Sequence, residues 1–183
     1  MIASLNTTGR MAVVCPHGVL FRSGAEGTIR KGMLEADLIE AVVGLGPNLF
    51  YGTGIPAAVL FINKNKSADR KLKVLIVNGS EEFAEGKNQN SLSNENVQRL
   101  SAVTHLWQEE ERFSQVVSLD EIRENDFNLN ITRYVDVSEP VQPIDVAQEL
   151  LRLKELLGKR DESEATMLAF LEELGYGSQV SVS

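Results

Sequence analysis

The sequence has one cysteine, two histidines and no long apolar run, and each scarcity excludes a class of protein. Cys15 cannot form an internal disulfide, and without a neighbouring Cys or a spaced pair of His it predicts no metal site. No stretch approaches the roughly 18 consecutive apolar residues of a membrane span, and the start MIASLNTTGR lacks the features of a signal peptide. We therefore expect a cytoplasmic protein with no metal and no membrane partner.

Positive charge is scarce as well. The formal net charge of -8 argues against a free-standing DNA-binding domain, because phosphate contacts require clustered Lys and Arg. Basic side chains outnumber acidic ones only in residues 1–74, nine against five. The charge pattern therefore predicts that any contact with nucleic acid lies early in the chain.

Four apolar runs predict the strands of one sheet. They cover residues 10–15, 38–45, 55–62 and 72–77 and are rich in β-branched side chains. The first run is continuous, which predicts a buried, central strand. A helix between the first two strands implies that these strands are parallel neighbours, whereas the short Gly-rich link before residue 55 permits an antiparallel pair. The sequence therefore predicts an α/β protein with a mixed sheet.

Side-chain spacing predicts the helices. In residues 24–37 the spacing of Ile29, Met33 and Leu34 indicates a helix that packs on the sheet, with Arg30 on its outer side. Residues 93–111 favour a second helix, and residues 113–117 a short strand. The tail reads as a pair of amphipathic helices, the first ending at Gly158.

Four sequence blocks resemble a known family in the same order. They are GRMAVVCPHGVLFRSGAEGTIRKGMLE, IEAVVGLGPNLFYGTGIPAAVLFINK, EEFAEGKNQN and LDEIRENDFNLNITRYVD. Together they resemble the modification (methylation) subunit of type I restriction-modification systems, an adenine-specific DNA methyltransferase. The resemblance implies the C-terminal part of a Rossmann-like, S-adenosylmethionine-dependent methyltransferase fold, whose mixed sheet has an antiparallel last strand. Residues 1–136 would be the second half of the catalytic domain, and residues 137–183 a helical tail that docks on another subunit.

Two motifs of that family are absent from the sequence. The family binds S-adenosylmethionine at a Gly-rich turn after its first strand and holds the target amine with an Asn-Pro-Pro-aromatic loop. The Gly-rich segment at residues 23–27 predicts only a turn that starts a helix. We therefore expect a C-terminal fragment without catalytic residues of its own, which alone is inactive and does not bind the S-adenosylmethionine of the full-length protein.

The Gly-rich link between the second and third predicted strands carries two aromatic residues. An adenine extruded from a DNA duplex must recover the stacking it loses, and an aromatic ring supplies it. The resemblance assigns this stacking to Phe50, with Tyr51 sharing it or packing behind it. The alternative is that Phe50 closes the hairpin onto the core. Neighbouring residues would complete the pocket loop, namely Gly52, Thr53 and Gly54.

A second loop directly follows the first predicted strand. Pro16, His17 and Gly18 lie at the carboxyl end of this strand, where ligands of open α/β sheets bind. We assign them to the same pocket. A hydrogen-bonding role within the turn is the alternative for His17.

Two polar clusters are candidate DNA contacts. Their residues are Lys87, Asn88, Gln89, Asn90, Asn128 and Asn130. The alternative is that they cap helices and form turns, which is the commoner use of Asn.

An apolar stripe runs along the tail with spacings of four, three and four residues. It consists of Val146, Leu150, Leu153 and Leu157. The resemblance implies three partners, which are DNA, a specificity subunit and a restriction subunit, and we assign the stripe to the specificity subunit. Packing against the second tail helix is the alternative.

Three functions remain open at this point. The first is a fragment of a DNA methyltransferase subunit that transfers a methyl group from S-adenosylmethionine to the exocyclic amine of adenine. The second is a non-catalytic module that docks on a subunit or binds DNA within such a complex. The third is an unrelated small α/β protein whose Gly-rich loops bind a nucleotide.

Overall fold

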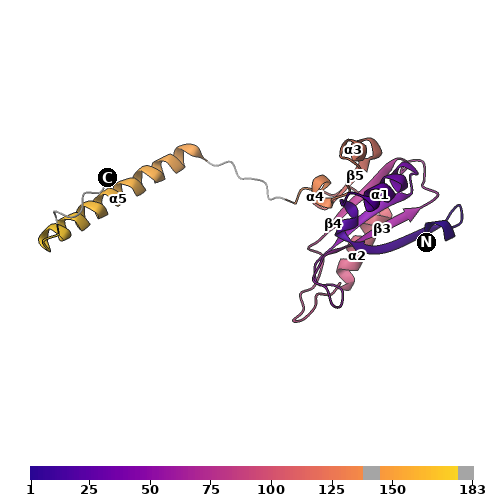
Figure 1. The fold of residues 1–183 in the computed structure, drawn as a ribbon, viewed down its shortest axis with the longest axis horizontal. Coiled ribbons are helices and arrows are strands. Elements are labelled where there is room, and N and C mark those ends of the chain that lie inside the picture. The colour runs from indigo at the N-terminus through magenta and orange to yellow at the C-terminus, as the bar shows by residue number, and fades with distance from the viewer. Residues whose placement is uncertain (138–144, 177–183) are drawn as a thin grey trace. The chain divides into compact units, whose positions relative to one another are not determined.

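A mixed sheet of five strands forms the centre of the first part of the chain in the computed structural model (Figure 1). The structure describes residues 1–137 and 145–176. The chain divides into two compact units, Met1–Ser138 and Glu139–Ser183. The strands, in sequence order, are β1 (Arg10–Pro16), β2 (Ile39–Leu45), β3 (Ala57–Asn63), β4 (Lys73–Gly79) and β5 (Ser114–Ser118).

The spatial order of the strands is β1-β3-β2-β4-β5. β3 lies antiparallel between β1 and β2, so these two strands run parallel to each other without being neighbours. β2 pairs parallel with β4, and β5 closes the far side antiparallel to β4. The antiparallel pairing of β2 with β3 confirms the predicted hairpin, and the α/β fold with a mixed sheet is confirmed with it.

β1 corrects one prediction, because it lies at an edge of the sheet and not at its centre. Its side chains alternate between exposed and half-buried, and Val14 is 54% exposed. Among the described residues, β1 pairs on one side only. A continuous apolar run indicates a strand whose two faces are both buried against other groups. It does not predict the position of that strand in the sheet, because strand order depends on pairing with distant segments.

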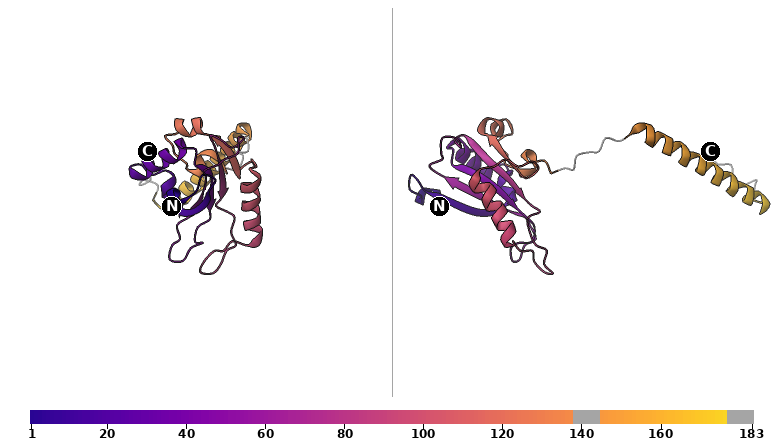
Figure 2. Two further views of the ribbon diagram at one scale, coloured as in Figure 1. Left: turned by 90° about the vertical axis from the view of Figure 1, so that its right-hand side faces the viewer. Right: turned by 180° about the vertical axis from the view of Figure 1, so that it is seen from behind.

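Two helices cover opposite faces of the sheet (Figure 2). On one face, α1 (Ala25–Glu35) packs a core that includes Leu34 and Val42, and on the other α2 (Asn94–Leu106) packs Leu100 against Val77. α1 begins after Gly24, whose φ of +74° is strained for other residues, so residues 23–27 form the predicted helix-start turn.

Short helices complete the face that α1 covers. They are η1 (Ile2–Ser4), η2 (His17–Leu20), α3 (Leu119–Glu124) and α4 (Ile131–Tyr134). The Ser118 hydroxyl accepts a hydrogen bond from the backbone of Glu121 and so caps α3. Buried Ile122 and Leu129 join this region to the core.

Arg30 corrects the predicted orientation of α1. Its side chain is 7% exposed, whereas Ile29, predicted to face inward, is 64% exposed. The Arg30 guanidinium donates from Nε to the Phe127 carbonyl at 2.7 Å, and from Nη1 to the carbonyls of Val19 (2.8 Å) and Arg22 (3.0 Å). Backbone carbonyls beside η2 and before α4 need donors when buried, and the forked guanidinium reaches all of them at once.

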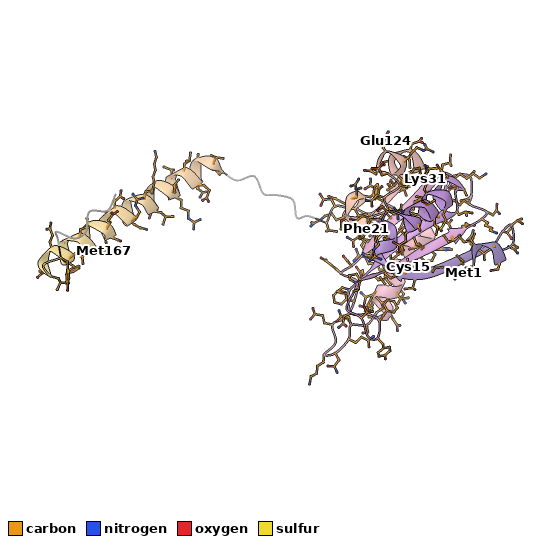
Figure 3. All side chains as sticks on the ribbon, viewed as in Figure 1. Met1, Cys15, Phe21, Lys31, Glu124 and Met167 are labelled. Atoms are coloured by element: carbon orange, nitrogen blue, oxygen red, sulfur yellow. The ribbon has the colours of Figure 1, made fainter. Side chains whose placement is uncertain are left out.

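The described part of the second unit, residues 145–176, contains one helix where a pair was predicted. α5 (Val146–Glu173) runs through Gly158, and none of its residues is buried (Figure 3). An interior glycine costs a helix only about 1 kcal/mol relative to alanine, which the surrounding Leu, Glu and Lys residues offset. Asp145 caps the first turn by accepting from the backbone of Ala147 and Gln148.

No helix within residues 1–137 and 145–176 is long and apolar enough to cross a membrane. The same residues contain no cluster of His, Cys, Asp and Glu side chains suited to a metal ion.

Candidate functional site

Three loops emerge where β1, β2 and β4 end. We call this side of the sheet its carboxyl edge, which is distinct from the lateral edge formed by β1. Pro16, which ends β1, lies opposite Ala57, while Gly44 near the end of β2 lies opposite Ala58, so both strands end at the same edge. The parallel register of Leu45 with Gly79 brings the end of β4 there too. The loops that follow β2 and β4 extend side by side beyond this edge (Figures 1 and 2). Ligands of open α/β sheets bind outside such carboxyl ends.

The loop of residues 46–56 presents its aromatic residues to solvent. Phe50 is 38% exposed and Tyr51 is 94% exposed. Neither belongs to the two core clusters, so Phe50 does not close the hairpin onto the core. Gly52 adopts a φ of +76°, and the Thr53 hydroxyl accepts a hydrogen bond from the backbone of Ile55 at 3.1 Å. The ring of Phe50 is therefore available to a ligand.

A cavity of about 200 Å³ lies beside Phe50. Its lining is almost entirely apolar and comes from both the β1 end and the aromatic loop, through Val14, Cys15, Pro16, Phe50, Thr53, Ile55, Pro56 and Ala57. The predicted neighbours Pro16 and Thr53 are thus brought to Phe50. Sites that enclose a small molecule usually exceed about 300 Å³, so this cavity is small for such a site.

His17 and Gly18, which were predicted in the same pocket, are not among the residues that line this cavity. The Nε2 atom of His17 is buried without a hydrogen-bond partner among the described residues. A Cβ atom on Gly44 would lie only 3.8 Å from it, so the imidazole ring packs over β2. Burial lowers the pKa of His17, and a backbone hydrogen bond at Ala57 opposes this shift. Gly18 is buried against the Arg22 guanidinium.

The polar cluster at residues 87–90 divides into two parts. Lys87 and Asn88 are exposed, and DNA contact stays a prediction for them. Gln89 Nε2 donates to the Leu49 carbonyl at 2.9 Å, and Asn90 Nδ2 donates to the Pro47 carbonyl at 3.0 Å. These two side chains therefore hold the aromatic loop.

The second polar cluster shapes a turn. Asn128 Oδ1 accepts from the Asn130 backbone at 2.8 Å, and the Tyr134 hydroxyl donates to the Asn128 carbonyl at 2.5 Å. Buried Leu129 between them donates its backbone N–H to Leu20. Neither Asn lines the cavity beside Phe50, and DNA contact stays a prediction for both.

The side chains of the apolar stripe of α5 are exposed within the described residues of this unit. Its exposed fractions are 65% for Val146, 53% for Leu150, 51% for Leu153 and 40% for Leu157. Because the described tail is one helix, packing against a second tail helix does not occur within residues 145–176.

Arg30 and Phe83 support the site and were missed by the sequence analysis. Arg30 joins η2 to the turn before α4 through its hydrogen bonds. The Phe83 ring packs against Gly46 so closely that a Cβ atom there would lie 2.4 Å from Phe83 Cδ1. The sequence gives only weak local signals of these contacts. Arg30 is an arginine next to the apolar positions of a helix, and Phe83 is an aromatic residue in an acidic loop.

Comparison with solved structures defines the class of protein that this fold represents. The type I restriction-modification methyltransferase subunit from Streptococcus thermophilus superposes with a TM-score of 0.67 at 43% identity, over 71% of this chain and 27% of that one. The EcoKI M protein superposes with a TM-score of 0.57 over 98% of this chain and 44% of that one, and at 20% identity it shows the fold alone. The described α/β unit is thus a part of a type I methylase-subunit fold.

The chain belongs to the N-6 DNA methylase family, whose model matches residues 1–142. It is 40% identical over 166 residues to the MjaVII methylase subunit of Methanocaldococcus jannaschii, and 31% identical over 189 residues to the HindI methylase subunit of Haemophilus influenzae. These matches cover 89% and 96% of this chain but only 29% and 42% of the two relatives. The predicted relationship to type I methylase subunits is confirmed, and the chain spans well under half the length of these relatives.

Proposed function

We propose that this chain supplies one wall of the target-base pocket in the methylase subunit of a type I restriction-modification system. The complete subunit transfers a methyl group from S-adenosylmethionine to the exocyclic amine of adenine in DNA. Phe50 stacks on the adenine after its extrusion from the duplex, and Tyr51 widens the aromatic surface at the loop tip. Stacking on an aromatic side chain contributes about 1–3 kcal/mol per base, which helps to offset the unstacking.

The exposure of Phe50 is the observation that carries this proposal. In a chain of the N-6 DNA methylase family, the partly exposed ring of Phe50 lies at the carboxyl edge of the sheet, next to an apolar cavity. An exposed aromatic ring beside an apolar cavity offers a surface on which a planar base can stack. We infer that the target base stacks on this ring on the side that faces the cavity and Pro16.

We infer that the described residues supply only part of a site for S-adenosylmethionine. The cavity beside Phe50 has no carboxylate in its lining, and the Gly-rich turn at Gly24 only begins α1. We propose that the cofactor site belongs to the part of the methylase that this chain does not span, and that the sheet continues along the unpaired edge of β1. The same part supplies the remaining walls of the base pocket.

Replacing Phe50 in the complete methylase, assembled with its specificity subunit, tests the proposal. Phe50→Ala removes the stacking face, so the single-turnover rate of DNA methylation should fall by about 5- to 150-fold, the equivalent of roughly 1–3 kcal/mol. Phe50→Tyr keeps the ring and is the matched control, which should retain the rate. Undiminished methylation by the alanine variant would remove the stacking role.

A docking role is the second candidate function, and α5 is the observation that favours it. An exposed apolar stripe on a long helix requires a partner surface to bury it. We propose that this stripe contacts the specificity subunit, while no described residue is assigned to the restriction subunit. If the chain is a non-catalytic module, changes at Phe50 leave methylation intact and changes in the stripe still dissociate the complex.

A further inference from the structure

The aromatic loop is held by a neighbouring loop rather than by itself. Within residues 50–56, the described bonds are a long contact from the Thr53 N–H to the Phe50 carbonyl at 3.4 Å and the side-chain contact of Thr53 with Ile55. The loop also contains Gly52 and Gly54, around which a Cβ would meet open space. On its own it has little to fix the direction of the Phe50 ring.

Residues 89 and 90 bind the three successive carbonyls that precede Phe50. Gln89 Nε2 donates to Leu49 at 2.9 Å, Asn90 Nδ2 donates to Pro47 at 3.0 Å, and the Asn90 backbone N–H donates to Asn48 at 2.9 Å. Every backbone carbonyl from 47 to 49 is thereby engaged. The stem of the aromatic loop is fixed up to the residue before the ring.

The loop that provides these donors is itself firmly closed. Ala84 and Ser91 exchange backbone hydrogen bonds of 2.8 and 3.0 Å. Gly86 packs so closely that a Cβ there would lie 2.0 Å from the Gln89 carbonyl oxygen. At the base of the loop, Glu82 accepts a hydrogen bond from Asn96 of α2 at 3.0 Å. The loop of residues 80–93 is therefore a rigid support anchored on α2.

The amide chemistry of Asn90 suits this role at both ends. Its Oδ1 accepts from the Gly86 N–H at 3.4 Å, while its Nδ2 donates to the Pro47 carbonyl. A carboxylate at this position would place an acceptor against an acceptor at Pro47. The same holds for a carboxylate at Gln89, which would face the Leu49 carbonyl.

We propose that Gln89 and Asn90 are positioning residues that set the Phe50 ring against the target base. The proposal rests on the function proposed above, because it assigns to these amides the support of the stacking residue and not a contact with DNA. A displacement of about 1 Å at a reacting centre costs up to roughly 100-fold in rate. The two amides therefore act on methyl transfer through Phe50.

The test uses the complete methylase with its specificity subunit and a duplex that contains the target sequence. Asn90→Asp and Gln89→Glu remove one donor each and keep the side-chain size. At saturating DNA and S-adenosylmethionine, we expect each to lower the single-turnover methylation rate by about 10- to 100-fold. Gln115→Glu on β5 makes the same amide-to-acid change on an exposed side chain, and its rate should stay within about twofold of the original.

A double-mutant cycle separates positioning from a general structural effect. If Asn90 acts through Phe50, adding Asn90→Asp to Phe50→Ala should lower the rate no further. Independent, multiplicative losses would overturn the proposal, since they point to loss of folding or to repulsion of DNA by the new charge. The assembly should stay folded at the assay temperature and keep its affinity for S-adenosylmethionine in the Asn90 variant, and a loss of either overturns the proposal as well.

The outcomes distinguish this proposal from the one on which it rests. A slow Phe50→Ala enzyme combined with full activity of both amide variants contradicts positioning and leaves the stacking role intact. A fully active Phe50→Ala enzyme contradicts the stacking role itself. Asn90→Ala removes the donor without adding charge, so the same cycle can be completed with it if the aspartate variant does not fold.

Discussion

Replacing Arg30 with Met should destabilise the first unit strongly, although it changes a charged residue to an apolar one of similar length. The guanidinium supplies hydrogen bonds to three backbone carbonyls, at Phe127, Val19 and Arg22, and its side chain is 7% exposed. Methionine has no donor to replace them. The variant therefore leaves these partly buried acceptors without their protein partner.

The magnitude follows from opposing contributions. An unsatisfied buried acceptor costs about 1–3 kcal/mol, so three carbonyls set a range of roughly 3–9 kcal/mol. The variant also removes the free-energy cost of burying a charged guanidinium, which acts in the opposite direction. This cost is the reason that burial lowers the pKa of Arg30. We expect a net loss near the lower limit, about 3 kcal/mol of unfolding free energy. For a chain of this size that corresponds to a fall in melting temperature of roughly 6–12 °C.

Urea unfolding followed by tryptophan fluorescence measures this loss. Trp107 is the one tryptophan of the sequence and packs on the core under α2, so its signal reports the first unit alone. Lys31→Met is the matched control on the same helix, because Lys31 makes only an exposed ion pair of 3.8 Å with Glu35 and a cation–π contact with Phe127. It should cost less than about 1 kcal/mol. Equal stability of the two variants would refute the role assigned to Arg30.

Two further predictions concern His17 and the tail. Burial lowers the folded-state pKa of His17, so its contribution to stability is complete above the unfolded-state pKa of about 6.5 and is lost as the pH falls below it. The urea midpoint of the original protein should therefore fall more between about pH 7 and pH 5 than that of His17→Gln, and parallel curves would contradict this. Leu153→Asp, in the exposed stripe of α5, should weaken binding to the specificity subunit about 10-fold or more without changing the Trp107 unfolding curve. Leu151→Asp, off the stripe but also exposed, is its control, and an equal loss would argue against a specific face.

The local elements of the fold were largely predictable from the sequence. Residues 55–62 were predicted as a strand, and β3 begins two residues later, at Ala57, after a proline that cannot donate to a sheet. Strand periodicity and helix spacing are properties of neighbouring residues, which is why such predictions succeed. The helix across residues 24–37 was predicted for the same reason, whereas the inward turn of Arg30 was not, because its acceptors lie far along the chain at Phe127.

The candidate site was predictable only in part. The sequence motifs indicated Phe50, Gln89 and Asn90 as site residues, but they predicted the two amides as DNA contacts or as turn residues. Their actual partners, the carbonyls of residues 47 and 49, are about 40 positions away. No local sequence pattern predicts a contact between two irregular loops, because neither loop has a periodic arrangement of apolar side chains.

The sequence by itself determined the family, the strands and the first helix, since each follows from side chains close together along the chain. Only the tertiary structure decided that β1 lies at an edge, that α5 continues through Gly158, and that the loop after β4 supports the loop after β2. These features depend on which distant groups satisfy each other's hydrogen bonds and bury each other's apolar surface. Those pairings form only when the whole chain is folded.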